Sequence, residues 1–129
     1  MIVNLINREN LMQITNSPFQ FYMTGSRYFG GATPASDYDF FAEDTRETVK
    51  WLEKNGYKLD MSIDYTDSTI SCIATKDNIQ IQLVKPSMMR IKKAINDKLY
   101  RYRHWFMKVD KIQRKLIWQM MVDTCVTQI

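Results

Sequence analysis

Two aspartates and a glycine-serine pair, close together in the first third of the chain, are the residues best suited to chemistry. Asp37 and Asp39 follow Gly25 and Ser26 in the stretch FYMTGSRYFGGATPASDYDFF. Residues two apart on a strand project from the same face, so the carboxylates should point the same way. Carboxylate oxygens are ligands for hard divalent cations, and a small flexible turn presents N–H groups to an anion. The sequence therefore predicts a cation site beside a phosphate site.

The segment from Gly25 to Phe40 resembles the signature of the nucleotidyltransferase superfamily related to DNA polymerase beta. That signature is a hydrophobic residue, then Gly-Ser, a gap of about ten residues, and Asp-x-Asp flanked by hydrophobic residues. The string Gly-Ser-Arg-x-x-Gly through Thr-Pro-x-Ser-Asp-Tyr-Asp is most similar to the small single-domain bacterial and phage members. Thr24 stands where a more apolar residue is usual. The strict match covers roughly sixteen of 129 residues, and the order of elements fits over about the first 85.

The resemblance implies roles for particular side chains. Asp37 and Asp39 match the two catalytic aspartates that bind Mg²⁺ or Mn²⁺ in that family. A neighbouring turn holds the phosphates of the nucleoside triphosphate substrate, and the arginine after it has the best claim to a direct phosphate contact, because its guanidinium bonds bidentately. The residues that match or adjoin this phosphate-holding part are Gly25, Ser26, Arg27 and Ser36.

The third metal-binding carboxylate of the family is the point at which this sequence departs from the pattern. A family member would show Asp or Glu where Gln80 or Gln82 stands, and we take Gln82 as the candidate catalytic residue. A glutamine carbonyl oxygen can ligate a hard cation, but it adds no negative charge and cannot act as a base. Whether Gln80, Gln82 or a more distant aspartate fills the position stays open. Those aspartates are Asp60, Asp64, Asp67 and Asp77.

Charge is divided unevenly along the chain. Residues 1–84 carry seven Lys or Arg against eleven Asp or Glu, whereas residues 85–129 carry eleven against three. The basic block is interleaved with aromatic residues, which is typical of a surface that binds a polyanion such as RNA. The alternative is a solvated helix face whose aromatic residues are buried. The candidate polyanion-binding residues are Lys92, Lys93, Arg101, Arg103 and Trp105.

The hydrophobic pattern predicts one α+β domain over residues 1–129, with a small mixed sheet backed by helices on one side. The core should cover residues 1–85. A basic helical tail, residues 86–129, should pack across the open side or flank of the cleft, with breaks near Asn96-Asp97 and Val109-Asp110. The predicted helices of the core are 5–14 and a capped helix ending at Asn55. The predicted strands are 19–24, 37–42, 57–61, 69–75 and 79–84.

Composition excludes several classes of protein. No apolar run is long enough to span a membrane, and no secretory signal is apparent at the N-terminus. With His104 as the only histidine, the chain has no His-based metal cluster, and we assign no catalytic triad. Cys72 and Cys125 lack metal-ligand spacing, which favours a reduced, cytoplasmic protein.

Two functions are consistent with these features. The first is a metal-dependent enzyme that transfers a nucleoside monophosphate from a triphosphate to a hydroxyl group on RNA, protein or a small molecule. The second is a degenerate family member that binds a nucleotide, RNA or a protein partner without turnover. The paired aspartates favour the enzyme, and the glutamines at the third position favour the binding protein.

Overall fold

Five strands form one mixed sheet in the order β1-β2-β5-β4-β3 in the computed structural model, which describes residues 2–61 and 67–127. Only the β2–β5 pair is parallel; the other neighbours are antiparallel. The α+β class with a small mixed sheet is therefore as predicted. The strands are β1 Tyr22–Thr24, β2 Tyr38–Glu43, β3 Lys58–Asp60, β4 Ile70–Lys76 and β5 Ile79–Val84.

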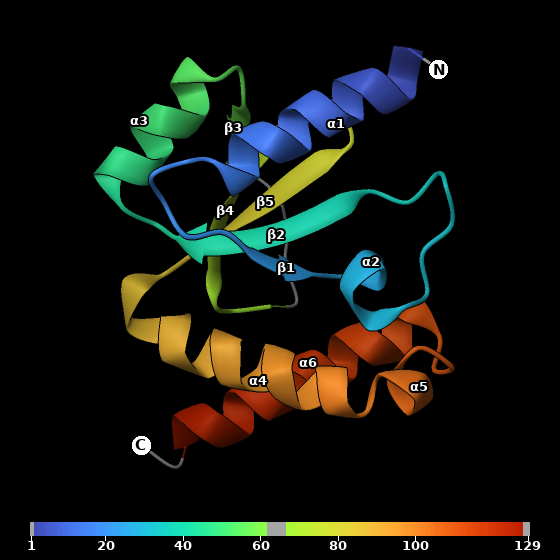
Figure 1. Cartoon of the computed structure of the whole chain (residues 1–129). Coiled ribbons are helices and arrows are strands. Elements are labelled where there is room, and N and C mark those ends of the chain that lie inside the picture. The colour runs from blue at the N-terminus through green and yellow to red at the C-terminus, as the bar shows by residue number, and fades with distance from the viewer. Residues whose placement is uncertain (1, 62–66, 128–129) are drawn as a thin grey trace.

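Helices cover both faces of the sheet: the helices of the core back one face, as predicted, and the basic tail covers the other (Figure 1). The reason is visible in β2, where the consecutive residues Phe40 and Phe41 are both buried although they point to opposite faces. Each face therefore needs an apolar cover. The helices are α1 Ile2–Thr15, α2 Ser26–Phe29, α3 Arg46–Lys54, the 3₁₀ turn η1 Pro86–Met88, α4 Met89–Arg101, α5 Arg103–Phe106 and α6 Lys111–Thr127.

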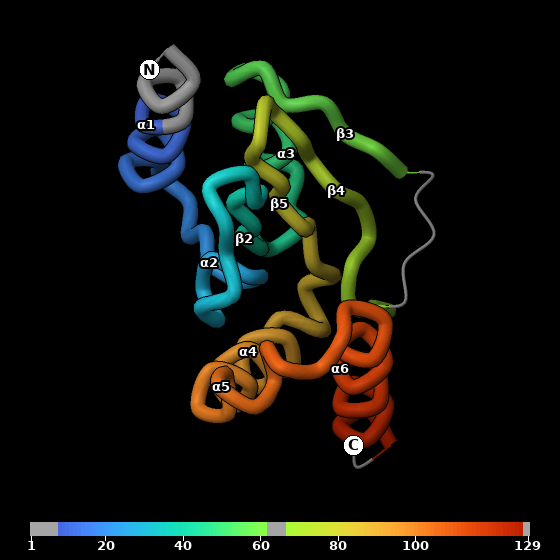
Figure 2. The backbone as a smooth tube through the Cα atoms, turned by 90° about the vertical axis from the view of Figure 1, so that its right-hand side faces the viewer, coloured from blue at the N-terminus to red at the C-terminus, as the bar shows by residue number. Residues whose placement is uncertain are grey.

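The helices divide into two groups. α1 and α3 lie on one side of the sheet, and α4, α5 and α6 lie on the other (Figure 1 and Figure 2). The first group covers a core that includes Phe40, Ile81 and Leu52. The second group packs on itself and on α2, with Phe29 among Ile95 and other apolar residues of the tail. The basic tail is thus joined to the phosphate-turn region by a core of its own.

Strand β5 has the bounds that its alternation predicts. Ile79, Ile81 and Leu83 have no exposed surface, whereas Gln80 and Gln82 are partly exposed on the other face. Period-two alternation places these two sets on opposite sides of the sheet. Because β5 pairs in parallel with β2, Gln80 lies opposite Asp39 and Gln82 lies opposite Phe41.

Other boundaries differ from the prediction. The first strand begins at Tyr22 and not at Phe19. The rings of Phe19 and Phe21, which precede it, pack on Trp51, with centroids 6.4 and 5.8 Å away. Thr45 caps α3 by accepting a hydrogen bond from the Thr48 N–H at 3.1 Å. The cap satisfies one of the N–H groups that the first helical turn leaves free.

Helix α4 runs through Asn96-Asp97, where a break was predicted. Asn96 is buried: its Oδ1 accepts from Thr24 Oγ1 at 2.6 Å, and its Nδ2 donates to the Met23 carbonyl at 3.1 Å. Asparagine is disfavoured in helix interiors because its side chain competes for local backbone hydrogen bonds. Here its side chain is instead bonded to Met23 and Thr24 of β1. The predicted break at Val109-Asp110 is present, since α6 begins at Lys111.

Candidate functional site

The predicted phosphate turn lies where β1 ends and α2 begins. Gly25 adopts φ 74° and ψ −169°, a conformation that is essentially restricted to glycine. Thr24, directly before it, is buried and held by Asn96, so helix α4 fixes the start of the turn. Ser26 opens α2 and lines a cleft between the sheet and the tail.

Gly25 lies against the carboxylate of Asp39. Thr24 pairs with Asp39 in the antiparallel β1–β2 ladder, which brings the turn next to this aspartate. A Cβ atom at Gly25 would collide with Asp39 Oδ2 and approach Asp39 Cβ to 2.9 Å. The absence of a side chain at Gly25 is therefore a condition for the carboxylate position, and the predicted meeting of the glycine and this aspartate is confirmed.

Gly25→Ala should both destabilise the protein and displace Asp39. We expect the free energy of unfolding to fall by about 1–3 kcal/mol from the backbone conformation alone, and any affinity for Mn²⁺ to be lost. Gly30→Ala is the matched control, because Gly30 also has a positive φ of 99° but an added Cβ there would meet nothing within 4 Å. Urea unfolding and Mn²⁺ titration of both variants test this. Equal loss of Mn²⁺ affinity in both variants would contradict it.

The two aspartates lie in different environments. Asp37 is exposed, and its Oδ2 accepts a hydrogen bond from Gln80 Nε2 at 3.2 Å. Burial raises the pKa of Asp39 to about 6, and the neighbouring Asp37 adds to that effect while Lys111 and Lys92 oppose it. An ionised carboxylate that is partly desolvated beside a second carboxylate is stabilised by a bound cation. The pair is thus suited to hold a divalent ion.

A cleft of about 740 Å³ contains both aspartates. Its walls come from the sheet face that bears Asp39 and from the tail helices. The ionisable side chains that line it, among the described residues, are Asp37, Asp39, Asp67, Lys92, Lys111, Arg114 and Lys115. Because carboxylates and cations lie within one cleft, the site suits a polyanion that carries its own metal ion.

Three of these cations come from α6 and were not among the predicted site residues. Lys111, Arg114 and Lys115 are spaced by three and four positions, so they share one face of the helix. Lys111 and Lys115 are exposed, and Arg114 is partly exposed while its Nη1 donates to the Val109 carbonyl at 2.6 Å. That spacing was the available signal in the sequence, but it does not reveal which surface the helix face meets.

Asp67, one of the more distant aspartates considered for the third position, lines the cleft. Its Oδ2 accepts from Lys92 Nζ at 2.6 Å, and its Oδ1 accepts from the N–H and hydroxyl of Thr69 at 2.9 and 2.6 Å. Lys92 Nζ also donates to Gln82 Oε1 at 2.7 Å. Burial lowers the pKa of the Lys92 ammonium, and Asp67 opposes that effect. Gln82, the predicted third residue, is therefore bonded to a cationic side chain.

The other candidates for the third position lie elsewhere. Asp77 is in the β4–β5 turn and accepts from Asn10 Nδ2 at 2.8 Å. Asp60 ends β3 and does not line the cleft. Asp64 lies outside the described residues. Gln80 is the side chain that reaches Asp37.

Arg27 and Ser36 have positions that the sequence did not reveal. The Arg27 guanidinium donates to the Ser36 carbonyl at 2.9 and 3.2 Å and stacks 3.9 Å from the ring of Tyr38. It also donates to the carbonyls of Thr33 and Pro34. This side chain holds the loop that precedes Asp37 and does not line the cleft, whereas Ser36 does. Arg27 thus stabilises the loop before Asp37. The direct phosphate contact that was predicted for its guanidinium is not supported by this position.

Of the five predicted polyanion-binding residues, Lys92 is the one that lines the cleft. Lys92 is buried in the cleft, whereas Lys93 is exposed, with its ammonium 4.8 Å from the Tyr22 ring. Trp105 is 55% exposed, and Arg101 is exposed at the end of α4. Arg103 stacks 4.2 Å from Tyr100. The other four predicted residues do not line the cleft.

Asp37 and Asp39 are the two carboxylates of the predicted metal site. Asp37 and Asp39 offer hard oxygen ligands, and magnesium commonly takes one or two carboxylates with substrate phosphates. In the part of the chain that the structure describes, no group of three His, Cys, Asp or Glu side chains is placed to hold a metal. The three-carboxylate arrangement implied by the resemblance is therefore not reproduced there.

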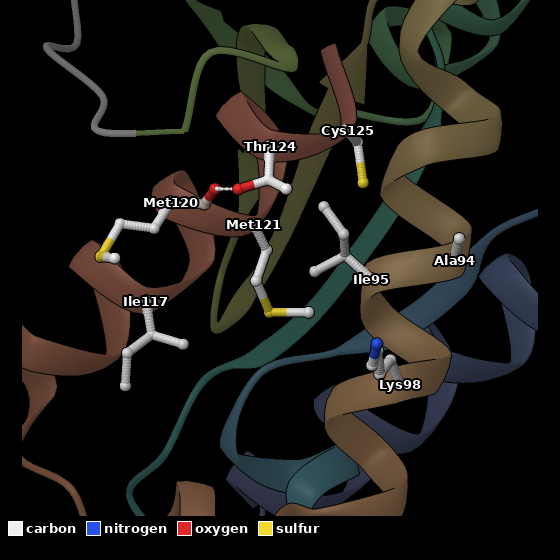
Figure 3. Close-up of a pocket in the computed structure, with 8 residues that line it drawn as sticks. All are labelled: Ala94, Ile95, Lys98, Ile117, Met120, Met121, Thr124 and Cys125. Carbon is white, nitrogen blue, oxygen red and sulfur yellow. Dashed lines mark hydrogen bonds between the residues drawn. The ribbon is translucent and has the colours of Figure 1, made fainter. Parts of the chain in front are cut away.

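A second cavity, of about 550 Å³, lies between α4 and α6 (Figure 3). It shares no lining residue with the cleft, and its walls are mainly apolar. The side chains of Ile95 and Met121 project into the space between the two helices. The remaining lining residues are Ala94, Lys98, Ile117, Met120, Thr124 and Cys125. Cys72 and Cys125 are both free thiols.

Comparison with known proteins gives no relative for this chain: no family model, curated protein or solved structure matches it. Among the helices that the structure describes, none combines the length and apolar character needed to cross a bilayer.

Proposed function

We propose that the protein binds a nucleoside triphosphate with Mg²⁺ or Mn²⁺ in the cleft and transfers the nucleoside monophosphate to a hydroxyl group on RNA, protein or a small molecule. The observation that supports this best is the contact between the Gly25 backbone and the Asp39 carboxylate inside a cleft that also contains basic side chains. A carboxylate that could bind a cation, a backbone turn and basic side chains in the same cleft are the features that a metal-bound triphosphate would need.

The residues would divide the work as follows. Asp37 and Asp39 hold the ion, which when bound neutralises phosphate charge and orients the triphosphate. Lys111, Arg114 and Lys115 attract the remaining phosphate charge. In the transfer, the acceptor oxygen bonds to the α-phosphorus. The bond between the α-phosphorus and the oxygen that bridges it to the β-phosphorus breaks, and pyrophosphate leaves. The hydroxyl proton passes to solvent.

A second candidate is supported by the contact between Gln82 and Lys92. Where a family member would carry a carboxylate able to act as a base, this chain carries an amide bonded to an ammonium. A protein so built would bind a nucleotide without turnover. Exposed Arg101 and Trp105 would then suit contact with RNA, and such binding should weaken steeply as salt is raised.

The two candidates separate in one experiment. Incubation with α-labelled triphosphates, Mn²⁺ and cell RNA or protein should label an acceptor, and Asp37→Ala and Asp39→Ala should each abolish the label. Asp97→Ala is the control, because Asp97 is exposed on α4 and does not line the cleft. Label that survives both cleft substitutions rules out transfer at this site. Saturable nucleotide binding without label identifies the second candidate.

A further inference from the structure

The buried ammonium of Lys92 is the least expected feature of the cleft. The residue is 1% exposed although lysine is rarely buried without a partner. Its Nζ lies 2.6 Å from Asp67 Oδ2, 2.7 Å from Gln82 Oε1 and 4.2 Å from the centre of the Trp118 ring. Removing a charge from water is costly unless it is paired and hydrogen-bonded, so these contacts are a condition for the fold.

Lys92 is hydrogen-bonded to the side-chain oxygens that could bind a metal ion on its side of the cleft. Asp67 is the cleft carboxylate outside the Asp37 and Asp39 pair, and both of its oxygens have donors, from Lys92 and from Thr69. The Gln82 carbonyl oxygen is bonded to Lys92 as well. A divalent ion at this wall would have to displace a buried ammonium from both partners and would meet it at close range.

We propose that the cleft takes its triphosphate with a single divalent ion, held by Asp37 and Asp39, and that Lys92 excludes a second ion from the Asp67 and Gln82 oxygens. This inference rests on the proposed function. The charge that a second ion would bring is supplied by α6, whose Lys111, Arg114 and Lys115 line the same cleft. Lysine and arginine are direct ligands for phosphate oxygens, so α6 needs no bridging metal.

The test counts bound Mn²⁺ by electron paramagnetic resonance, with a saturating non-hydrolysable triphosphate. Wild type should bind one Mn²⁺ per chain. Lys92→Met and Lys92→Gln should each raise the count to two, because both remove the ammonium charge from Asp67 Oδ2 and Gln82 Oε1. Lys93→Met is the control and should stay at one, since Lys93 is exposed on the same helix and does not line the cleft.

Each outcome decides the matter. Two ions per chain in wild type would overturn the inference and leave the proposed function intact. A folded Lys92→Met or Lys92→Gln variant that still binds one ion would show that Lys92 does not exclude the second. Absence of any Mn²⁺ or triphosphate binding in wild type would overturn both this inference and the proposed function.

Discussion

Asp39→Asn is expected to make the protein more stable at neutral pH and to abolish its binding of divalent ions. Burial raises the pKa of Asp39 from 3.8 to about 6, so the folded chain holds the ionised carboxylate at a cost. A difference of this size corresponds to at most about 3 kcal/mol at pH 7.5. Asparagine removes that cost. It also removes the negative charge on which a cation depends, and Mn²⁺ affinity should fall at least about 100-fold, or about 2.7 kcal/mol.

The stability gain should depend on pH in a defined direction. Because the folded state binds the Asp39 proton more tightly than the unfolded chain, its contribution to the free energy of unfolding falls as pH rises through about 4 to 6. The difference between Asp39→Asn and wild type should therefore be largest above pH 7 and should vanish near pH 4. In wild type, protons should compete with Mn²⁺ below about pH 6.

Urea unfolding at pH 7.5 and pH 4.5, with Mn²⁺ titration at both, measures these effects. Asp37→Asn is the matched control, because Asp37 is exposed and asparagine can still accept the hydrogen bond from Gln80. Asp37→Asn should also lose affinity for Mn²⁺. Its gain in stability should be smaller than that of Asp39→Asn, because it removes only the repulsion between Asp37 and the Asp39 carboxylate. If Asp39→Asn were less stable than wild type at pH 7.5, ionisation of the Asp39 carboxylate would not destabilise the folded protein.

The sheet and the meeting of glycine with aspartate could be predicted because both depend on short-range patterns. Strong alternation predicted the bounds of β5. The pairing of β1 with β2 was not predicted; it is antiparallel. Thr24 pairs with Asp39 in that ladder, which brings the next residue, Gly25, against the Asp39 carboxylate. The stretch from Gly25 to Asp39 is thus short enough for its sequence to predict that its two ends meet.

The tail contributions could not be predicted, because they depend on which face of a helix meets the sheet. Lys92 and Lys93 are adjacent basic residues in the sequence, yet one is buried beneath Trp118 and the other is exposed. The local sequence at Asn96 predicts a helix break, but the hydrogen bonds of Asn96 to β1 outweigh that preference. Arg27 likewise contacts loop carbonyls that no spacing rule connects to it.

Which glutamine stands at the position of the missing carboxylate can be decided by a pair of substitutions. Gln80 lies opposite Asp39 in the parallel ladder, and its amide is 3.2 Å from Asp37 Oδ2. Gln80→Glu should therefore add a third charged oxygen ligand to the same ion and raise Mn²⁺ affinity about tenfold, or about 1.4 kcal/mol. Without metal, the added like charge should lower stability at pH 7.5 by about 1 kcal/mol.

Gln82→Glu provides the matched comparison on the same strand and the same face. Its carboxylate would meet the Lys92 ammonium, which already lies 2.7 Å from Gln82 Oε1, and would pair with that cation in preference to a metal ion. Mn²⁺ affinity should therefore stay within about twofold of wild type. Isothermal titration of both variants measures the contrast. A gain in Gln82→Glu with none in Gln80→Glu would mean that the ion lies toward Lys92, against the position that Asp37 and Asp39 define.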